Sequence, residues 1–319
     1  MLPEYQCPTW LKMGGHVQTI YPKLLADANI TYRRQLFWDS RKQTQVAYDF
    51  VDASDKNTPL VVLLHGLEGS SQSHYALALM AAVKQKQWQG VVVHYRGCGG
   101  VVNTSDKAYH SGDSLECQWV LQQLRQHYPT QKLFVMGVSL GGNVLAKYLA
   151  ETGEKALPDA AAVVSAPLDL NMASVALEHG LSKQLYAPYF LRSLLPKALS
   201  EQHKHPHLNW AKLQQSRSLK QFDEHYTAPV HGFDNADAYY RLSSAKPLLR
   251  QIQIPTLLLN AQNDPFLPAN ALPQQNDVAS CVTLLQPKEG GHVGFVSGSF
   301  PGNIQWLPQT VLTFFSEQA

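Results

Sequence analysis

Short apolar runs recur along the chain and are separated by polar or amphipathic stretches. Five runs are rich in aliphatic residues and end at glycine, proline or a polar cluster: 60–66, 90–97, 132–137, 161–167 and 255–262. Continuous apolar runs of this length are typical of strands that are buried on both faces, as in a parallel sheet. The earlier segment 43–52 alternates loosely, which predicts a strand with one face in contact with water.

Amphipathic patterns fill the intervals between these runs. Apolar residues recur at spacings of three and four over 74–87, 113–127 and 140–150, so helices are predicted there. A further strand is expected at 281–287, followed by a final amphipathic segment at 304–317. Strand–helix alternation predicts βαβ crossovers and therefore a mostly parallel, doubly wound α/β sheet.

The alternation stops after residue 167, and roughly 85 residues pass before the next clear strand. Because a structureless loop of that length is rare in a compact domain, we expect a mostly helical cap over 168–245, inserted after the sixth strand. The α/β core would then comprise 1–167 and 246–319. Several cap residues are expected to form an apolar pocket: Tyr186, Tyr189, Phe190, Leu191 and Leu194.

Composition and charge exclude several classes of protein. The 319 residues are 45% hydrophobic and 16% charged, as in a globular protein with a large core. A net charge of +2 gives no electrostatic basis for binding nucleic acid or an anionic membrane. No stretch approaches the ~18 apolar residues of a membrane span, and no signal-peptide pattern opens the chain. We therefore expect a cytoplasmic protein without an integral membrane segment.

Neither a metal nor a cofactor is expected. The four cysteines, Cys7, Cys98, Cys117 and Cys281, are scattered and form no C-x-x-C pair, which fits a reducing compartment. Three histidines occur within 203–207, but a proline interrupts the helical spacing, and we interpret this segment as a solvated loop. No G-x-G-x-x-G opens a helix after the first strand, so a dinucleotide site is not supported.

The stretch MGVSLGGNVL contains Gly137, Ser139 and Gly141 in a G-x-S-x-G spacing. Alone the spacing is weak, because roughly one chain in ten of this length would contain it by chance. Here it directly follows a predicted strand and opens a predicted helix, which is the context of a nucleophilic serine on a sharp turn. The alternative is a serine that only caps the helix.

An acid and a base follow Ser139 in the order that this kind of site uses. Asp264 comes directly after the strand at 255–262, and His292 lies in a loop ahead of the last helix. In isolation each has an ordinary explanation, as a turn residue or a loop residue. Together and in order, the three favour a Ser–Asp–His triad. Asp277 is the competing acid, but it lies nearer the following strand.

Two backbone N–H groups are expected to stabilise an oxyanion. Leu140 follows the nucleophile, and Leu67 follows His65-Gly66 at the end of an early strand. Gly66 lets this loop approach the substrate closely. We interpret His65 as a buried, hydrogen-bonded loop residue, because His292 already supplies the base.

Two residues of the stretch HYRGCGG (94–100) are further candidates for a role in binding or catalysis. Arg96 lies at the carboxyl edge of the sheet, where ligands bind in α/β folds, but an arginine that ties loops together is favoured over a substrate ligand. Cys98 has no base placed beside it, so it is not predicted to be a nucleophile.

Nearly the whole chain resembles the α/β-hydrolase superfamily, and within it the YheT-like branch of esterases. The resemblance is carried by the following stretches: GGHVQTIYP (14–22), LLHGLEGSSQSHY, YRGCGG, YHSGDSLE (109–116), GVSLGGNVLAKYLAE, FDEHYTAPVHGFDNADAYY (222–240), LLLNAQNDPFLP and EGGHVGF. Two small departures are His94 and Asn263, where related sequences are expected to have Asn and Asp.

The resemblance implies a triad of Ser139, Asp264 and His292, in agreement with the residue patterns. It also implies hydrolysis of small-molecule carboxylic esters, for which we expect short to medium acyl chains. Acyl transfer to an alcohol by the same triad is the alternative. A second alternative is a non-catalytic binding protein on a hydrolase fold, which the complete set of three residues disfavours.

Overall fold

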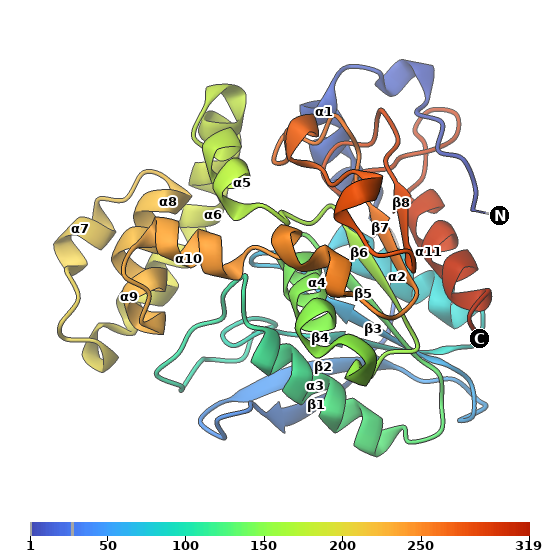
Figure 1. Cartoon of the computed structure of the whole chain (residues 1–319), viewed down its shortest axis with the longest axis horizontal. Coiled ribbons are helices and arrows are strands. Elements are labelled where there is room, and N and C mark those ends of the chain that lie inside the picture. Colours follow the sequence, from blue (N-terminus) through green and yellow to red (C-terminus); the bar gives the residue numbers. More distant parts are fainter. Residues whose placement is uncertain (1, 27–28) are drawn as a thin grey trace.

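An eight-stranded sheet forms the centre of the molecule in the computed structural model, which describes residues 2–26 and 29–319 (Figure 1). The strands are β1 (Arg33–Trp38), β2 (Gln45–Val51), β3 (Leu60–Leu64), β4 (Gln89–Val93), β5 (Leu133–Val138), β6 (Ala160–Val164), β7 (Thr256–Leu259) and β8 (Val282–Leu285). Their spatial order is β1-β2-β4-β3-β5-β6-β7-β8. β2 is antiparallel to both of its neighbours, and all other pairs are parallel. The predicted, mostly parallel α/β sheet is confirmed.

Helices cover both faces of this sheet, as the alternating pattern predicted. α3 (Ser114–His127) and α4 (Leu140–Thr152) pack on one face, against strand residues such as Val62 and Val91. α2 (His74–Gln85) and α11 (Trp306–Ser316) pack on the other face, against residues such as Val61 and Val92. Because neighbouring strand residues point to opposite faces, the central strands are apolar throughout and have two buried sides.

Two strands at the β1 edge differ from what the patterns indicated. β1 was not predicted, because its residues are mostly exposed and carry no apolar alternation. The expectation of a wet face on β2 is wrong, since Val46–Val51 are all buried. The acidic residue of this strand, Asp49, is buried in an ion pair with Arg34 and accepts a hydrogen bond from Ser71 Oγ.

The segment between β6 and β7 is helical and lies to one side of the sheet (Figure 1, yellow-green to orange). It comprises α5 (Leu170–Leu177), α6 (Gly180–Ser200), α7 (Trp210–Gln214), α8 (Leu219–Phe222), the π-helical turn η5 (Asp223–Thr227), α9 (Ala228–His231) and α10 (Ala236–Ser243). These helices have a small apolar core of their own, which includes Leu213 and Tyr226. The limits 168–245 for a separate cap domain stay a prediction.

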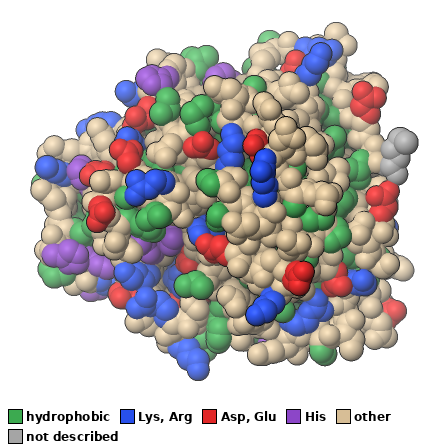
Figure 2. All heavy atoms as spheres, in the orientation of Figure 1, with side chains coloured by type: hydrophobic (Ala, Val, Ile, Leu, Met, Phe, Trp, Pro, Cys, Tyr) green, Lys and Arg blue, Asp and Glu red, His purple; other side chains and the backbone are tan. Residues whose placement is uncertain are grey.

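The remaining elements are short. They are α1 (Gly15–Ile20) and the 3-10 turns η1 (Thr9–Leu11), η2 (Tyr21–Leu25), η3 (Gly153–Lys155), η4 (Gln202–Lys204), η6 (Lys246–Gln251), η7 (Ala269–Ala271) and η8 (Gln275–Asp277). Acidic and basic side chains are interspersed on the face shown in Figure 2, in keeping with the small net charge. Within residues 2–26 and 29–319, every helix is too short or too polar to cross a membrane.

Candidate active site

The strand order places a reaction centre at the middle of the sheet. The chain proceeds from β3 to β4 on one side and then returns to β5 on the other side of β3. Loops that leave such a switch point at the carboxyl ends of parallel strands diverge and open a crevice. The loop after β3 carries Gly66 and Leu67, and the turn after β5 carries Ser139, so both reach this crevice.

Ser139 occupies the sharp turn between β5 and α4. Its backbone has φ 53° and ψ −120°, a conformation that costs a non-glycine residue on the order of 1–3 kcal/mol. The turn is held because the Ser139 N–H donates to the Val164 carbonyl at 2.9 Å, and the Ser139 carbonyl accepts the N–H groups of Gly142 and Asn143. Strain that is supported in this way fixes where the side chain points.

Close backbone approach explains the glycines on either side of Ser139. A Cβ added to Gly137 would lie 2.4 Å from the Gly141 carbonyl oxygen, and one added to Gly141 would lie 2.4 Å from the Leu64 carbonyl oxygen. Gly66 approaches from the neighbouring loop, where an added Cβ would meet Ser139 Cβ at 3.1 Å. The G-x-S-x-G spacing is therefore required by the packing of three backbone segments.

The structure brings Ser139, Asp264 and His292 into one hydrogen-bonded chain. His292 Nε2 lies 3.0 Å from Ser139 Oγ, and His292 Nδ1 lies 2.8 Å from Asp264 Oδ2. Asp264 is buried, and its Oδ1 accepts the Phe266 N–H at 2.8 Å. A carboxylate on Nδ1 selects the tautomer that carries a proton there, so Nε2 is left to accept the serine proton. The competing acid, Asp277, caps η8 instead.

The two residues proposed to supply backbone amides for the oxyanion also lie at this site. Leu67 and Leu140 line the same cavity as Ser139 and His292. Within the described chain, neither of these two N–H groups donates a hydrogen bond, whereas the next residue in the loop, Glu68, donates its N–H to Tyr109 Oη at 3.0 Å. Two free donors beside a serine are what an oxyanion hole requires.

A cavity of about 450 Å³ lies above Ser139, between the sheet edge and the cap helices. This volume is within the usual range for small-molecule sites. Of the five cap residues expected to form an apolar pocket, Phe190 and Leu194 line it. The other three do not, because α6 turns only one side to the cavity: Tyr186 contacts His16, Tyr189 is 54% exposed and Leu191 packs inside the cap.

A brace from the N-terminal part of the chain holds the His292 loop, and the residue patterns did not predict it. Thr19, on α1, accepts the His292 N–H on its Oγ1 at 2.9 Å and donates that hydroxyl to the Gly15 carbonyl. Asn263 Oδ1, next to Asp264 in sequence, accepts the Gly291 N–H at 3.0 Å. These bonds fix the backbone on both sides of the triad.

Gln18 is the centre of this brace. It is 1% exposed, and its Oε1 accepts the Gly290 N–H and the Asn263 side-chain amide, both at 2.8 Å. Its Nε2 donates to Glu289 Oε2 and to the Leu11 carbonyl. The only sequence signal for the brace was the stretch GGHVQTIYP, which contributed to the resemblance without an assigned role.

Replacing Gln18 with alanine is expected to lower the free energy of unfolding by about 1–3 kcal/mol, because buried donors and acceptors lose their partners. It should also lower kcat for an ester substrate more than it changes KM, since the loops that carry Asp264 and His292 lose their support. Urea unfolding and steady-state kinetics measure the two effects. Gln72→Ala, on an exposed side chain, is the control, and equal behaviour of the two variants would contradict the brace.

Two other candidates, His65 and Cys98, are buried in the structure. His65 is fully buried, and burial together with nearby His94 lowers its pKa to about 3. Its Nδ1 donates to the Gly66 carbonyl at 2.7 Å, and its Nε2 accepts the Tyr95 N–H. Burial raises the pKa of Cys98 to about 12, which disfavours a thiolate nucleophile.

The interpretation of 203–207 as a solvated loop is wrong for one residue. His203 and His207 are exposed, but His205 is buried against Tyr226 of the cap core. In the part of the chain that the structure describes, no group of three or more His, Cys, Asp or Glu side chains is arranged to hold a metal ion.

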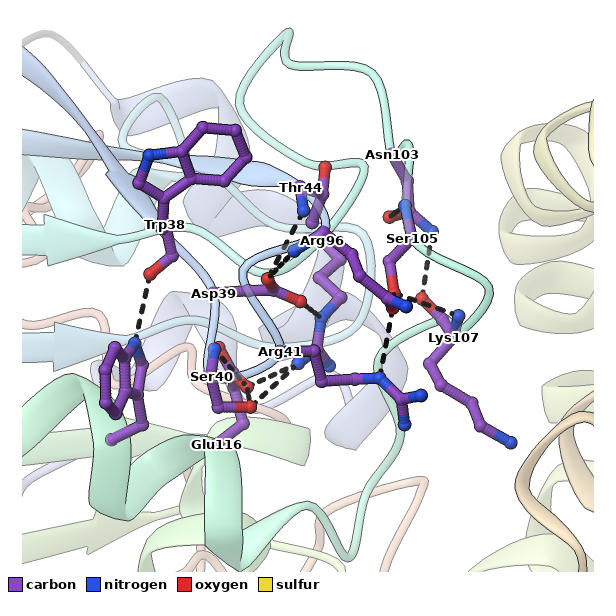
Figure 3. A network of polar contacts seen from close by, with 12 residues as sticks. Trp38, Asp39, Ser40, Arg41, Thr44, Arg96, Asn103, Ser105, Lys107 and Glu116 are labelled. Atoms are coloured by element: carbon purple, nitrogen blue, oxygen red, sulfur yellow. Dashed lines mark hydrogen bonds and ion pairs between the residues drawn. The ribbon is translucent and has the colours of Figure 1, made fainter.

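Arg96 ties loops together, as the sequence favoured. Figure 3 shows its guanidinium between Asp39 and Glu116, with Ser40 beside them. Nε lies 2.8 Å from Asp39 Oδ2, Nη1 lies 3.1 Å from Asp113 Oδ2, and Nη2 contacts Glu116. Arg96 is 5% exposed, so its charge is balanced inside the protein by three carboxylates.

Replacing Arg96 with methionine is expected to destabilise the protein by about 3–5 kcal/mol, because buried carboxylates lose their cation. Thermal and urea unfolding measure this loss. Arg41→Met is the matched control, since the Arg41–Asp106 pair is largely exposed and should contribute less than about 1 kcal/mol. A loss at Arg96 no greater than at Arg41 would show that the network does not support the fold.

Comparison with known proteins shows relatives in sequence and neighbours in fold. The family described as the alpha/beta hydrolase fold matches residues 59–299. "Putative esterase YheT" of Escherichia coli is 36% identical over 93% of this chain and 88% of its own length. Human "Phospholipase ABHD3" is 27% identical over 98% of this chain and 79% of its own length. A solved structure of the Pyrococcus furiosus esterase Pf2001 superposes with a TM-score of 0.60 at 17% identity, covering 91% of this chain and 92% of that one.

The fold and the matched family define an α/β hydrolase. The chain belongs to the α/β-hydrolase family and is YheT-like within it.

Proposed function

We propose that this protein is a serine hydrolase that cleaves carboxylic esters through an acyl-enzyme on Ser139. The observation that carries the proposal is the chain of contacts from Ser139 Oγ through His292 to Asp264, at the wall of the cavity. Its sequence relatives, which are named as an esterase and a phospholipase, support ester cleavage as the reaction.

The proposed reaction uses only groups of this chain. His292 Nε2 takes the hydroxyl proton as Ser139 Oγ attacks the ester carbonyl carbon, and the Leu67 and Leu140 amides stabilise the oxyanion. The bond to the alcohol oxygen then breaks, and His292 returns the proton to the leaving alcohol. Water, deprotonated by His292, hydrolyses the acyl-enzyme and restores Ser139. Asp264 stabilises the imidazolium at both stages.

The lining of the cavity supports a preference for esters with short to medium acyl chains. Its apolar wall is formed by core and cap residues that include Leu67, Pro167, Leu170, Phe190 and Leu194. A series of p-nitrophenyl esters of increasing chain length measures this preference, and kcat/KM should fall once the chain exceeds the length that the cavity encloses.

Covalent labelling tests the proposal directly. A fluorophosphonate probe should modify Ser139, and mass spectrometry of the digested protein identifies the labelled peptide. Absence of label on Ser139 in folded protein would contradict the proposal and would favour a non-catalytic binding protein.

The acyltransferase alternative shares the first half of the reaction. Adding an alcohol during turnover separates the two, because a transferase forms the new ester in excess of the free acid.

A further inference from the structure

A carboxylate that ester cleavage does not use lies in the wall of the same cavity. Asp223 begins the π-helical turn η5 and lines the cavity together with Ser139 and His292. It is deep inside the molecule, yet part of its surface is open to the cavity. π-Helical turns occur frequently at functional sites, because they displace one residue from the regular helix.

The carboxylate has two hydrogen-bond donors and, within residues 2–26 and 29–319, no ion-pair partner. Thr227 Oγ1 donates to Oδ1 at 2.6 Å, and Tyr240 Oη donates to Oδ2 at 2.7 Å. Burial, opposed by these two bonds, raises the pKa of Asp223 to about 6, so the carboxylate form is present at neutral pH. Each oxygen of an ionised carboxyl can accept about two hydrogen bonds, so acceptor capacity remains on the side open to the cavity.

The other carboxylates of the cavity wall have cationic partners. Glu68 pairs with Lys197 at 2.7 Å, and Glu201 pairs with Lys204 at 3.3 Å. Among the cavity-lining residues that the structure describes, Asp223 is the carboxylate without an ion pair. An uncompensated charge in a poorly hydrated site is costly, and a donor group on a bound ligand would remove that cost.

The cavity wall contains apolar side chains and a polar cluster. Leu140, Pro167 and Phe266 are among the apolar residues, and Asp223, Thr227 and Tyr240 form the hydrogen-bonded cluster. A ligand that fills the cavity would therefore meet both kinds of surface. A plain alkyl ester offers no hydrogen-bond donor to the cluster.

We propose that Asp223, supported by Thr227 and Tyr240, forms a polar subsite for a hydrogen-bond-donating group of the ester substrate, a hydroxyl or an ammonium. The substrate class is then an acyl ester with a second polar group, on either the acyl or the alcohol part, rather than a simple alkyl ester. This inference rests on the proposed esterase function. Asp223 does not touch the reacting atoms, and its role is in specificity.

Matched substrates test the subsite. On the acyl side, p-nitrophenyl esters of heptanoic, 6-hydroxyhexanoic and 6-aminohexanoic acid differ only in the terminal methyl, hydroxyl or ammonium. On the alcohol side, hexanoate esters of hexanol, pentane-1,5-diol and 5-aminopentanol have the same difference. The wild-type protein is expected to favour one polar member in at least one set by about 10-fold in kcat/KM. The member that is favoured identifies the donor.

The variant Asp223→Asn keeps the size of the side chain and removes its charge. It should reduce a preference for ammonium to about 2-fold or less, and a preference for hydroxyl by about 5-fold, because an amide oxygen is a weaker acceptor. Glu224→Gln is the matched control, since it makes the same chemical change on the same turn, at an exposed side chain whose Oε2 accepts the Ala236 N–H of α10. The preference should survive in Glu224→Gln, and melting temperatures show whether both variants remain folded.

Three results would overturn the subsite: no preference for either polar member in wild type, an unchanged preference in Asp223→Asn, or an equal loss in Glu224→Gln. These results leave the proposed function intact as long as p-nitrophenyl heptanoate is hydrolysed in a Ser139-dependent manner. If no ester is hydrolysed, the proposed function itself fails. Binding of hexane-1,6-diol and 6-aminohexanol to wild type and Asp223→Asn, measured by calorimetry, then still tests the subsite, and equal affinities would overturn it.

Discussion

Replacing Ser139 with alanine is expected to lower kcat for a p-nitrophenyl acyl ester by about 10⁴- to 10⁶-fold. Without Oγ no acyl-enzyme can form, and the remaining rate comes only from water attack assisted by the amides and by binding. KM should change little, because the hydroxyl contributes little to binding of the ground state. Stopped-flow and steady-state assays measure the loss, and a pre-steady-state burst should disappear with it.

The variant must be shown to fold. Alanine can adopt the Ser139 turn at a cost similar to that of serine, so the melting temperature should stay within a few degrees of wild type. Ser280→Ala removes an exposed hydroxyl far along the chain and serves as the control that should keep wild-type kinetics. A Ser139→Ala protein with wild-type turnover would show that another residue is the nucleophile.

Replacing Asp264 with asparagine is expected to lower kcat by about 10³- to 10⁴-fold. The Asp264 carboxylate accepts from His292 Nδ1 at 2.8 Å, which leaves Nε2 free to take the serine proton. An asparagine amide can donate to Nδ1 and thereby stabilise the opposite tautomer, in which Nε2 already carries a proton. It also removes the negative charge that stabilises the imidazolium. Steady-state kinetics over a range of pH measure the loss.

The competing acid provides the matched control. Asp277→Asn makes the same chemical change at a carboxylate that only caps η8, so kcat should stay within about 2-fold of wild type. If Asp277→Asn lost activity and Asp264→Asn did not, the acid of the triad would be assigned to the wrong residue. A double variant, Ser139→Ala with Asp264→Asn, should be no slower than Ser139→Ala alone, because residues that act as one unit are not additive.

Much of the fold was predictable, because its central elements are encoded locally. β3, β4 and β5 are buried on both faces, so each appears as an unbroken apolar run that only a covered sheet accommodates. α3 and α4 show the expected three-and-four spacing. β1 escaped prediction because an exposed edge strand needs no apolar pattern, and β2 was misjudged because the charge of Asp49 is neutralised by a partner that is distant in sequence.

The candidate site was predictable to the extent that its members follow strands in a set order. Ser139 comes directly after β5, Asp264 lies in the loop after β7, and His292 lies in the loop after the last strand, β8. Their meeting point follows from the topology. The orientation of α6 was not predictable, since several of its sides are apolar and only packing decides which one faces the cavity. This is why Tyr189 is on the surface and Phe190 lines the cavity.

The sequence by itself determined the class of fold, the sharp turn at Ser139 and the order of the three reacting side chains, because these depend on residues that are near one another in the chain. Only the tertiary structure decided how Gln18 braces the loops of the triad, how Arg96 is neutralised and that Asp223 has hydrogen bonds but no ion pair among the described residues. Each of these depends on which distant groups are packed together. The sequence identifies a polar side chain, but it does not show whether a distant group will pair with that side chain in the folded protein.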